Sequence, residues 1–261
     1  MVEKALKKFY VFLIFVFLYA PIIILIIFSF NNSKTLSKWD GFTFKWYLEL
    51  FKDDEIMKSL YYTIVIACLS SVISTLIGIF AALSIHNMKG FKKKIILNIN
   101  YLPVLNPDIV TAISFMTLFK FMSMNFGFMT MLLSHIAFNV PYVVLSILPK
   151  LKHMNKYLEE AAMDLGATPL YALRKVIIPE IMPGIITGGL LAFTLSIDDF
   201  VISFFNTGNG VTNLSITVYS MARRGIKPEL NALSTIMFST VLILLLLINK
   251  RNSKEDGGGL M

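Results

Sequence analysis

Three acidic residues lie inside long apolar stretches of this chain: Asp108, Asp198 and Asp199. A carboxylate within a membrane span is costly, so such residues usually mark a binding site or an ion path. Carboxylates attract amines, and an aromatic ring such as that of Trp46, near the expected mouth of the path, can add cation–π contacts. These residue types predict a path for a polycation, with binding weak enough to allow release.

Asp108 and Asp198 are predicted to lie at the same depth. Counted from Lys94 and Pro183 at ~1.5 Å per residue, both lie roughly 20 Å along their helices, in the outer half of a ~30 Å hydrocarbon core. Asp199 points about 100° around the helix from Asp198, so at most one of the two faces the path squarely. The alternative is that the acids only cap a broken helix near Pro107 or pair with basic residues, the candidates being Lys120, Arg223 and Arg224.

His135 and Asn139 lie one helical turn apart, just before Pro141. They could line a path or, with further ligands, hold a metal. A lone histidine in a helix bundle more often forms an interhelical hydrogen bond, which is the role we predict. Cys68 is the only cysteine and lies in an apolar run, so we expect no disulfide and no cysteine-rich metal site. We predict no metal and no catalytic residue in this chain.

The composition is that of a membrane protein. Hydrophobic residues make up 56% of the 261 positions and charged residues only 15%, whereas soluble domains carry about 25% charged residues. The net charge of +8 does not indicate nucleic acid, because the basic residues form short clusters beside apolar runs. There they suit anionic lipid head groups.

Six apolar runs predict an all-α, polytopic membrane protein with six transmembrane helices. The third run contains Pro103 and Pro107, so we expect a kink there. We assign 1–250 to one transmembrane domain and 251–261 to a flexible C-terminal tail. The predicted spans are 9–30, 60–85, 95–119, 126–148, 183–205 and 230–248.

The distribution of lysine and arginine predicts the orientation. The N-terminal tail, 86–94, 150–180 and the C-terminal tail together hold fifteen basic residues, against nine in the other segments. The more basic set is expected in the cytoplasm. Both termini and the polar loop at 150–183 are therefore predicted to be cytoplasmic.

The polar stretch 155–183 is predicted to form two short helices joined at Gly166, the second beginning at Thr168 and ending at Pro179. An apolar row on the first helix could lie on lipid. Glu159, Glu160 and Asp164 argue against this, because an anionic membrane surface repels them. A protein partner fits the first helix better.

Glu160-Ala161-Ala162, then Gly166, then Val176-Ile177-Ile178-Pro179 resembles the EAA motif of ATP-binding-cassette (ABC) importer permeases. Both spacings of that motif are kept, while Val176 and Ile178 replace the usual Ile and Leu. The resemblance implies the type I ABC importer permease fold. It also implies a coupling helix that docks in a cytoplasmic ATPase, and the residues assigned to this contact are Glu159, Glu160, Ala161, Ala162, Asp164 and Gly166.

The resemblance covers most of the chain from about Tyr61 onward. The segments 195–203 and 219–232 are similar to those of spermidine/putrescine permeases within this family, and this likeness ranks Asp198 first among the path residues. The implied partners are a second permease subunit in a heterodimer, two copies of a cytoplasmic ATP-binding subunit and an external polyamine-binding protein. No G-x-x-x-x-G-K-[ST] occurs in the chain, so we expect the partner ATPase to bind ATP-Mg and this chain to bind no cofactor.

The resemblance implies a transport subunit without enzymatic activity, multi-pass in the bacterial cytoplasmic (inner) membrane, that alternates between outward and inward access. One alternative is a permease for another small solute, such as iron, an organic acid or a sugar. Another is a polytopic membrane enzyme, but the convergent catalytic residues that it requires are not apparent. An ion channel would not need the large coupling loop.

Overall fold

The computed structural model describes residues 2–34, 38–155, 157–208, 210–224, 227–239 and 242. Within these ranges the regular structure is helical, apart from one bridge between Asn31 and Phe42. The all-α prediction is confirmed. The chain divides into two compact units, Met1–Met57 with Val218–Met261 and Lys58–Thr217, which are described separately. The predicted tail at 251–261 lies outside the described residues.

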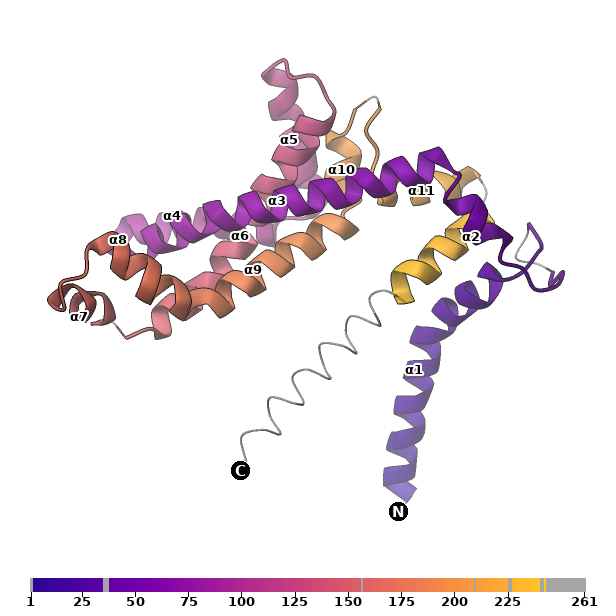
Figure 1. Ribbon diagram of the computed structural model, residues 1–261, viewed down its shortest axis with the longest axis horizontal. Helices are drawn as coiled ribbons and strands as arrows, with labels where there is room; N and C mark the ends of the chain where they lie inside the picture. Colours follow the sequence, from indigo (N-terminus) through magenta and orange to yellow (C-terminus); the bar gives the residue numbers. More distant parts are fainter. Residues whose placement is uncertain are drawn as a thin grey trace. The chain divides into compact units, whose positions relative to one another are not determined.

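Figure 1 shows the helices in chain order. The first unit contains α1 (Val2–Ser29), α2 (Lys45–Leu50) and a helical stretch at 228–239, and α3 (Asp54–Asn87) and α11 (Leu214–Arg224) cross between units. The helices of the second unit are α4 (Gly90–Leu105), α5 (Asp108–Phe121), α6 (Phe128–His153), α7 (Leu158–Asp164), α8 (Pro169–Ala172), the π-helical η1 (Leu173–Ile177), α9 (Ile178–Asp198) and α10 (Val201–Asn206).

Four described helices are long and apolar enough to cross a membrane: Leu6–Ser29, Asp54–Asn87, Phe128–His153 and Pro169–Asp198. The bent pair α4 and α5 makes a fifth candidate. They correspond to the first five predicted spans. The sixth predicted span, 230–248, lies partly outside the described residues.

The third predicted span is broken rather than kinked. The helix axes of α4 and α5 differ by 108°. Asn106, the residue before Pro107, has an extended backbone with ψ 147, because the proline ring disfavours the helical conformation of the preceding residue. Asp108 therefore starts a new helix, and the assumption of one continuous helix from Lys94, on which its predicted depth rested, is wrong.

The second short helix was predicted to end at Pro179. That prediction is wrong. The Thr168 hydroxyl caps this helix by accepting from the Tyr171 N–H at 3.3 Å, and the helix runs unbroken from Pro169 to Asp198. In η1 the Ile178 N–H donates to the Leu173 carbonyl. This wider turn lies directly before Pro179, which has no N–H to donate, and the helix continues past the proline. The fifth predicted span, 183–205, in turn breaks after Asp198.

Helix α9 lies alongside α6 at glycine contacts (Figure 1). A Cβ atom on Gly184 would lie 2.9 Å from the Ser146 carbonyl oxygen, and one on Gly188 would lie 3.1 Å from Val143 Cα. Only residues without a side chain permit such close backbone approach. Gly184 and Gly188 thus face α6, whereas Gly189 faces Thr75 of α3.

The first unit is organised around the segment between α1 and α3. The Asn31 carbonyl accepts from the Trp46 indole Nε1–H at 2.6 Å, and the Asn31 side chain bonds the Lys38 carbonyl and the Asp40 N–H. Trp46 is only 2% exposed. The hydrogen bond from the Trp46 indole to the Asn31 carbonyl holds α2 against the end of α1.

We expect Gly184→Ala to destabilise the protein by about 1–3 kcal/mol, because the added methyl group meets the backbone of α6. Gly189→Ala is the matched control on the same helix. Its methyl group meets only the Thr75 side chain, with the hydroxyl oxygen at 3.1 Å, and this side chain can rotate away. Thermal unfolding in detergent micelles measures both, and equal losses of stability would contradict the assigned contact.

The Asp53–Lys227 ion pair makes the stability of the first unit depend on pH. The Lys227 Nζ lies 2.9 Å from the Asp53 Oδ2. Burial acts to raise the pKa of Asp53, but hydrogen bonds from Lys227 and from the Ile56 and Glu55 amides, with the Lys227 charge, hold the pKa below its ordinary 3.8. The hydrogen bond to Asp53 raises the pKa of Lys227 above 10.5.

Asp53→Asn should lower the free energy of unfolding by about 0.5–1 kcal/mol at neutral pH, the range of a partly exposed pair. The Asp53 contribution is present above pH 3.8 and is lost as the pH falls through its folded pKa. The Lys227 contribution is present below pH 10.5 and is lost as the pH rises through its folded pKa. Thermal unfolding at a series of pH values should show mutant and wild type converging at both extremes. Asp54→Asn, at an exposed neighbour, is the control, and a pH-independent difference for Asp53→Asn would contradict the pairing.

Candidate functional site

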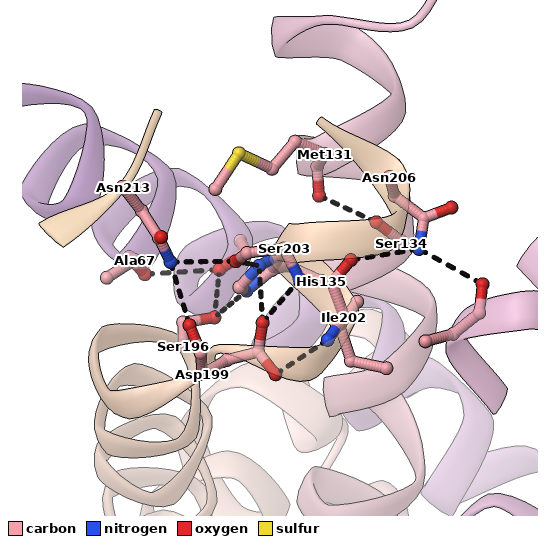
Figure 2. Close-up of polar contacts among 12 residues, drawn as sticks. Ala67, Met131, Ser134, His135, Ser196, Asp199, Ile202, Ser203, Asn206 and Asn213 are labelled. Carbon is pink, nitrogen blue, oxygen red and sulfur yellow. Dashed lines mark hydrogen bonds and ion pairs between the residues drawn. The ribbon is translucent and has the colours of Figure 1, made fainter. Parts of the chain in front are cut away.

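The break between α9 and α10 carries two adjacent acids in different surroundings. Helix α9 ends at Asp198, and Asp199 follows with an extended backbone, ψ 125. Asp198 is exposed, whereas the side chain of Asp199 is only 10% exposed and points into a polar cluster (Figure 2). The sequence predicted that at most one of the two acids faces the path squarely, with Asp198 ranked first, and in the structure only Asp198 is exposed.

Asp199 closes the broken helix. Its two carboxylate oxygens accept the backbone N–H groups of Ile202 at 3.0 Å and Ser203 at 2.6 Å. The Asn213 side-chain amide donates to the Asp199 carbonyl oxygen at 2.7 Å. These bonds satisfy backbone groups that a broken helix leaves without partners. The sequence analysis offered helix capping by an acid, near Pro107, as the alternative to a role in the path. In the structure Asp199 caps a helix in this way, at the break between α9 and α10.

His135 of α6 occupies the centre of the cluster and is 1% exposed. Its Nδ1 lies 2.9 Å from the Ser196 hydroxyl of α9, and its Nε2 lies 3.0 Å from the Ser203 hydroxyl of α10. The Nε2 also lies 3.5 Å from the Asp199 Oδ2. The predicted interhelical hydrogen bond is confirmed. Because an ionised carboxylate only accepts, the neighbouring Nε2 is the nitrogen that carries the proton, and Nδ1 accepts from Ser196.

The cluster extends from α6 to α3 and to the segment before α11. Asn139 donates to the Ser196 hydroxyl at 2.9 Å, and the Ser196 and Ser70 hydroxyls lie 2.8 Å apart. Asn213 donates to the Ser203 hydroxyl at 2.8 Å. Sequence reasoning missed these serines and Asn213. The sequence feature that could have identified them is the presence of hydroxyl and amide side chains within apolar spans, because such side chains commonly form hydrogen bonds between helices.

Asp108 lies near the same region of the second unit. It is exposed at the first position of α5, within electrostatic reach of the Tyr142 hydroxyl of α6. Tyr142 packs on a cluster of buried apolar residues that includes Ala112 of α5, which begins at Asp108, and Ile202 of α10, which follows the break after Asp198. The chain segments that follow the two acids therefore contribute to one apolar cluster. Among the described residues, neither forms an ion pair with Lys120.

Trp46 belongs to the first unit, and its position is described only within that unit. The Lys45 Nζ lies 5.1 Å from the centroid of its ring. The buried indole thus already has one cation–π partner. A role for Trp46 in the path stays a prediction.

The predicted first short helix of the loop is α7, and none of its residues is buried. Gly166 follows it with φ +88, the left-handed conformation predicted for its stop. The Ala167 N–H donates to the Ala162 carbonyl at 3.1 Å, and the Gly166 N–H donates to the Met163 carbonyl at 2.8 Å. This pair of bonds is a Schellman motif. Leu165, next to Gly166, is 90% exposed, so the end of α7 presents an apolar side chain to a partner or to solvent.

The two acids at the break should differ in their effect on stability. We expect Asp199→Asn to cost about 1–3 kcal/mol, because the amide retains one oxygen for two buried N–H groups and loses the charge. Asp198→Asn removes an exposed carboxylate and should change stability by less than about 0.5 kcal/mol. Thermal unfolding of both variants in detergent tests this, and the reverse order would contradict the assigned contacts.

Comparison with known proteins gives three results. Residues 74–250 match the family described as "Binding-protein-dependent transport system inner membrane component". The chain is 38% identical over 261 residues to the spermidine/putrescine transport system permease protein PotC of Shigella flexneri, covering 99% of each chain. It is 38% identical over 239 residues to the putrescine transport system permease protein PotI of Escherichia coli K12, covering 87% of this chain and 83% of that one.

Among solved structures, the fold is similar to that of a chain of a bacterial ABC transporter involved in the import of the acidic polysaccharide alginate. The TM-score is 0.73 at 13% identity, and the match covers 97% of this chain and 96% of that chain. At this identity the likeness concerns the fold alone. It agrees with the ABC importer permease fold expected from the EAA motif.

Proposed function

This chain belongs to the family of binding-protein-dependent transport system inner membrane components, and from that premise we propose that it carries polyamines through the membrane. It is a multi-pass permease subunit of an ABC importer in the inner membrane. The observation that carries the proposal is the full-length similarity to permeases named for spermidine and putrescine. Two exposed acids, Asp108 and Asp198, whose neighbouring chain segments contribute to one apolar cluster, support it.

The path binds its cargo by charge. A polyamine is a flexible chain with several ammonium groups, and it must exchange water for protein ligands on entering a span. Exposed carboxylates at Asp108 and Asp198 attract ammonium groups without fully burying them, so binding stays reversible. Trp46 is proposed to meet the cation at the outer end of the path. Asp199 contributes through the conformation of the break.

Helix α7 couples the path to the ATPase. Glu159, Glu160, Ala161, Ala162, Asp164 and Gly166 are proposed to contact that partner, which binds ATP-Mg. The helix Pro169–Asp198 starts two residues after the Schellman turn and ends at the proposed cargo ligand. Its 30 residues span about 45 Å. One continuous rod therefore joins the docking helix to Asp198, and a movement of α7 is passed to the break.

The proposed assembly is a heterodimer with a second permease, two ATP-binding subunits and an external polyamine-binding protein. Both termini of this chain face the cytoplasm, as does the coupling loop at 150–183. One transmembrane domain is proposed to span 1–250.

Binding-protein-dependent uptake of labelled spermidine and putrescine, in vesicles carrying all subunits, tests the cargo. Asp198→Asn and Asp108→Asn should each reduce uptake at low polyamine concentration by about tenfold or more, the effect of one lost charge-assisted contact. Asp54→Asn, at the exposed acid that begins α3, is the control and should keep wild-type uptake. Wild-type uptake by both path variants at equal expression would contradict the acidic path, and no polyamine uptake by the wild-type assembly would contradict the cargo.

Gly166→Val tests the coupling. A β-branched residue is strongly disfavoured at φ +88, so the Schellman turn should reorganise and α7 should lose its docking geometry. We expect the ATPase to lose most of its stimulation by loaded binding protein. Gly41→Val introduces the same strain at φ +93 in a loop of the other unit, and should leave the stimulation intact. Full stimulation in the Gly166→Val assembly would contradict the role of the turn.

A further inference from the structure

Asp198 and Asp199 are adjacent in sequence, but only one of them is free to meet a cargo. Asp199 has both carboxylate oxygens occupied by backbone N–H groups and its side chain turned into the protein. Asp198 is exposed. Resting on the proposed function, in which Asp198 binds a polyamine amine, we infer that His135 and Asp199 form a positioning pair. His135 holds Asp199, and Asp199 fixes the direction in which Asp198 points.

The backbone at the break sets the direction of Asp198. Helix α9 ends at this residue and the chain turns into α10 within two residues. The turn is held by the two N–H bonds to the Asp199 carboxylate and by Asn213 on the Asp199 carbonyl. If the carboxylate rotates away, the Ile202 and Ser203 amides lose their partners and the end of α9 is free to rewind. Asp198 would then move by a fraction of a helical turn.

His135 is placed to prevent that rotation. Its ring is held on both sides, by Ser196 at Nδ1 and Ser203 at Nε2, while the Nε2 edge lies 3.5 Å from the Asp199 carboxylate. Figure 2 shows the imidazole, Ser203 and Asn213 converging on Asp199. The ring belongs to α6, which is packed on α9 at Gly184 and Gly188. The imidazole thus holds the break at a fixed position relative to α6, on which α9 packs.

Two substitutions at position 135 separate positioning from packing. The amide nitrogen of glutamine reaches the place of Nε2, so His135→Gln keeps a donor towards Ser203 and Asp199. Asparagine is shorter and reaches only the place of Nδ1, so His135→Asn keeps the contact with Ser196 and loses the contact with Asp199. Ser134→Ala is the control, because the Ser134 hydroxyl is buried but bonds only to Thr130 and Met131 of its own helix.

The experiment measures the initial rate of spermidine uptake against spermidine concentration in vesicles, normalised to the amount of assembled complex. His135→Asn should raise KM by about tenfold, the size of one lost hydrogen bond to a charged group, with the maximal rate within about twofold of wild type. His135→Gln should restore most of the wild-type KM. Ser134→Ala should leave KM unchanged. A purely structural histidine would change only the amount of assembled complex.

A double-mutant cycle shows whether His135 acts through Asp199. If it does, His135→Asn with Asp199→Asn should raise KM no further than Asp199→Asn alone. Additive increases in KM, or a His135→Asn variant with a wild-type KM, would overturn the inference. These failures differ from failure of the proposed function, in which the wild-type complex does not import spermidine or Asp198→Asn leaves KM unchanged.

Discussion

A helix within a bilayer can end only where its terminal N–H and C=O groups find partners, because each such group without a partner costs several kcal/mol in hydrocarbon. Most of this chain obeys that constraint with long helices, but α9 ends at Asp198 inside an apolar stretch. The protein satisfies the freed groups itself: the Asp199 carboxylate accepts two amides and Asn213 binds the Asp199 carbonyl. The polar cluster of His135, Ser196 and Ser203 exists around this one interruption. Asp198, the last residue before this interruption, is exposed.

The rigidity of the second unit makes such a break useful. Gly184 and Gly188 bring the backbone of α9 against α6, and buried apolar residues from α3 to α9 pack around that contact. The helix Pro169–Asp198 is uninterrupted although it contains Pro179 and Pro183. The π-helical turn before Pro179 accommodates the first of these prolines. A continuous helix between the turn at Gly166 and the break at Asp199 suits the transmission of a displacement better than a series of short helices.

Much of this architecture is readable from the sequence, because the bilayer imposes a simple rule on length and polarity. The apolar runs predict the first five spans, Gly166 predicts the left-handed stop after α7, and the EAA spacing identifies the loop. Prolines are poor guides to helix ends in this chain, since the helix breaks at Pro107 but continues through Pro179, where a π-helical turn precedes the proline. Periodicity also cannot assign Asp198 and Asp199, because they lie where the helix ends and the ~100° step between neighbours no longer applies. Ser196, Ser203 and Asn213 become informative only once three segments are seen to meet at His135.

The placement of the acids also bears on selectivity. A carboxylate that is nearly buried and already accepts two backbone N–H groups, such as that of Asp199, adds negative potential but is poorly placed to bind an ammonium group. An exposed carboxylate such as those of Asp198 and Asp108 can bind one and release it. In the proposed path, splitting the two tasks between neighbouring residues would let the fixed charge attract a polycation while the exposed one sets how tightly it is held. A transport path needs acids of both kinds. Acids that only bond the protein backbone would not bind the cargo, and without such acids the backbone that carries the exposed carboxylate would not be held in one conformation.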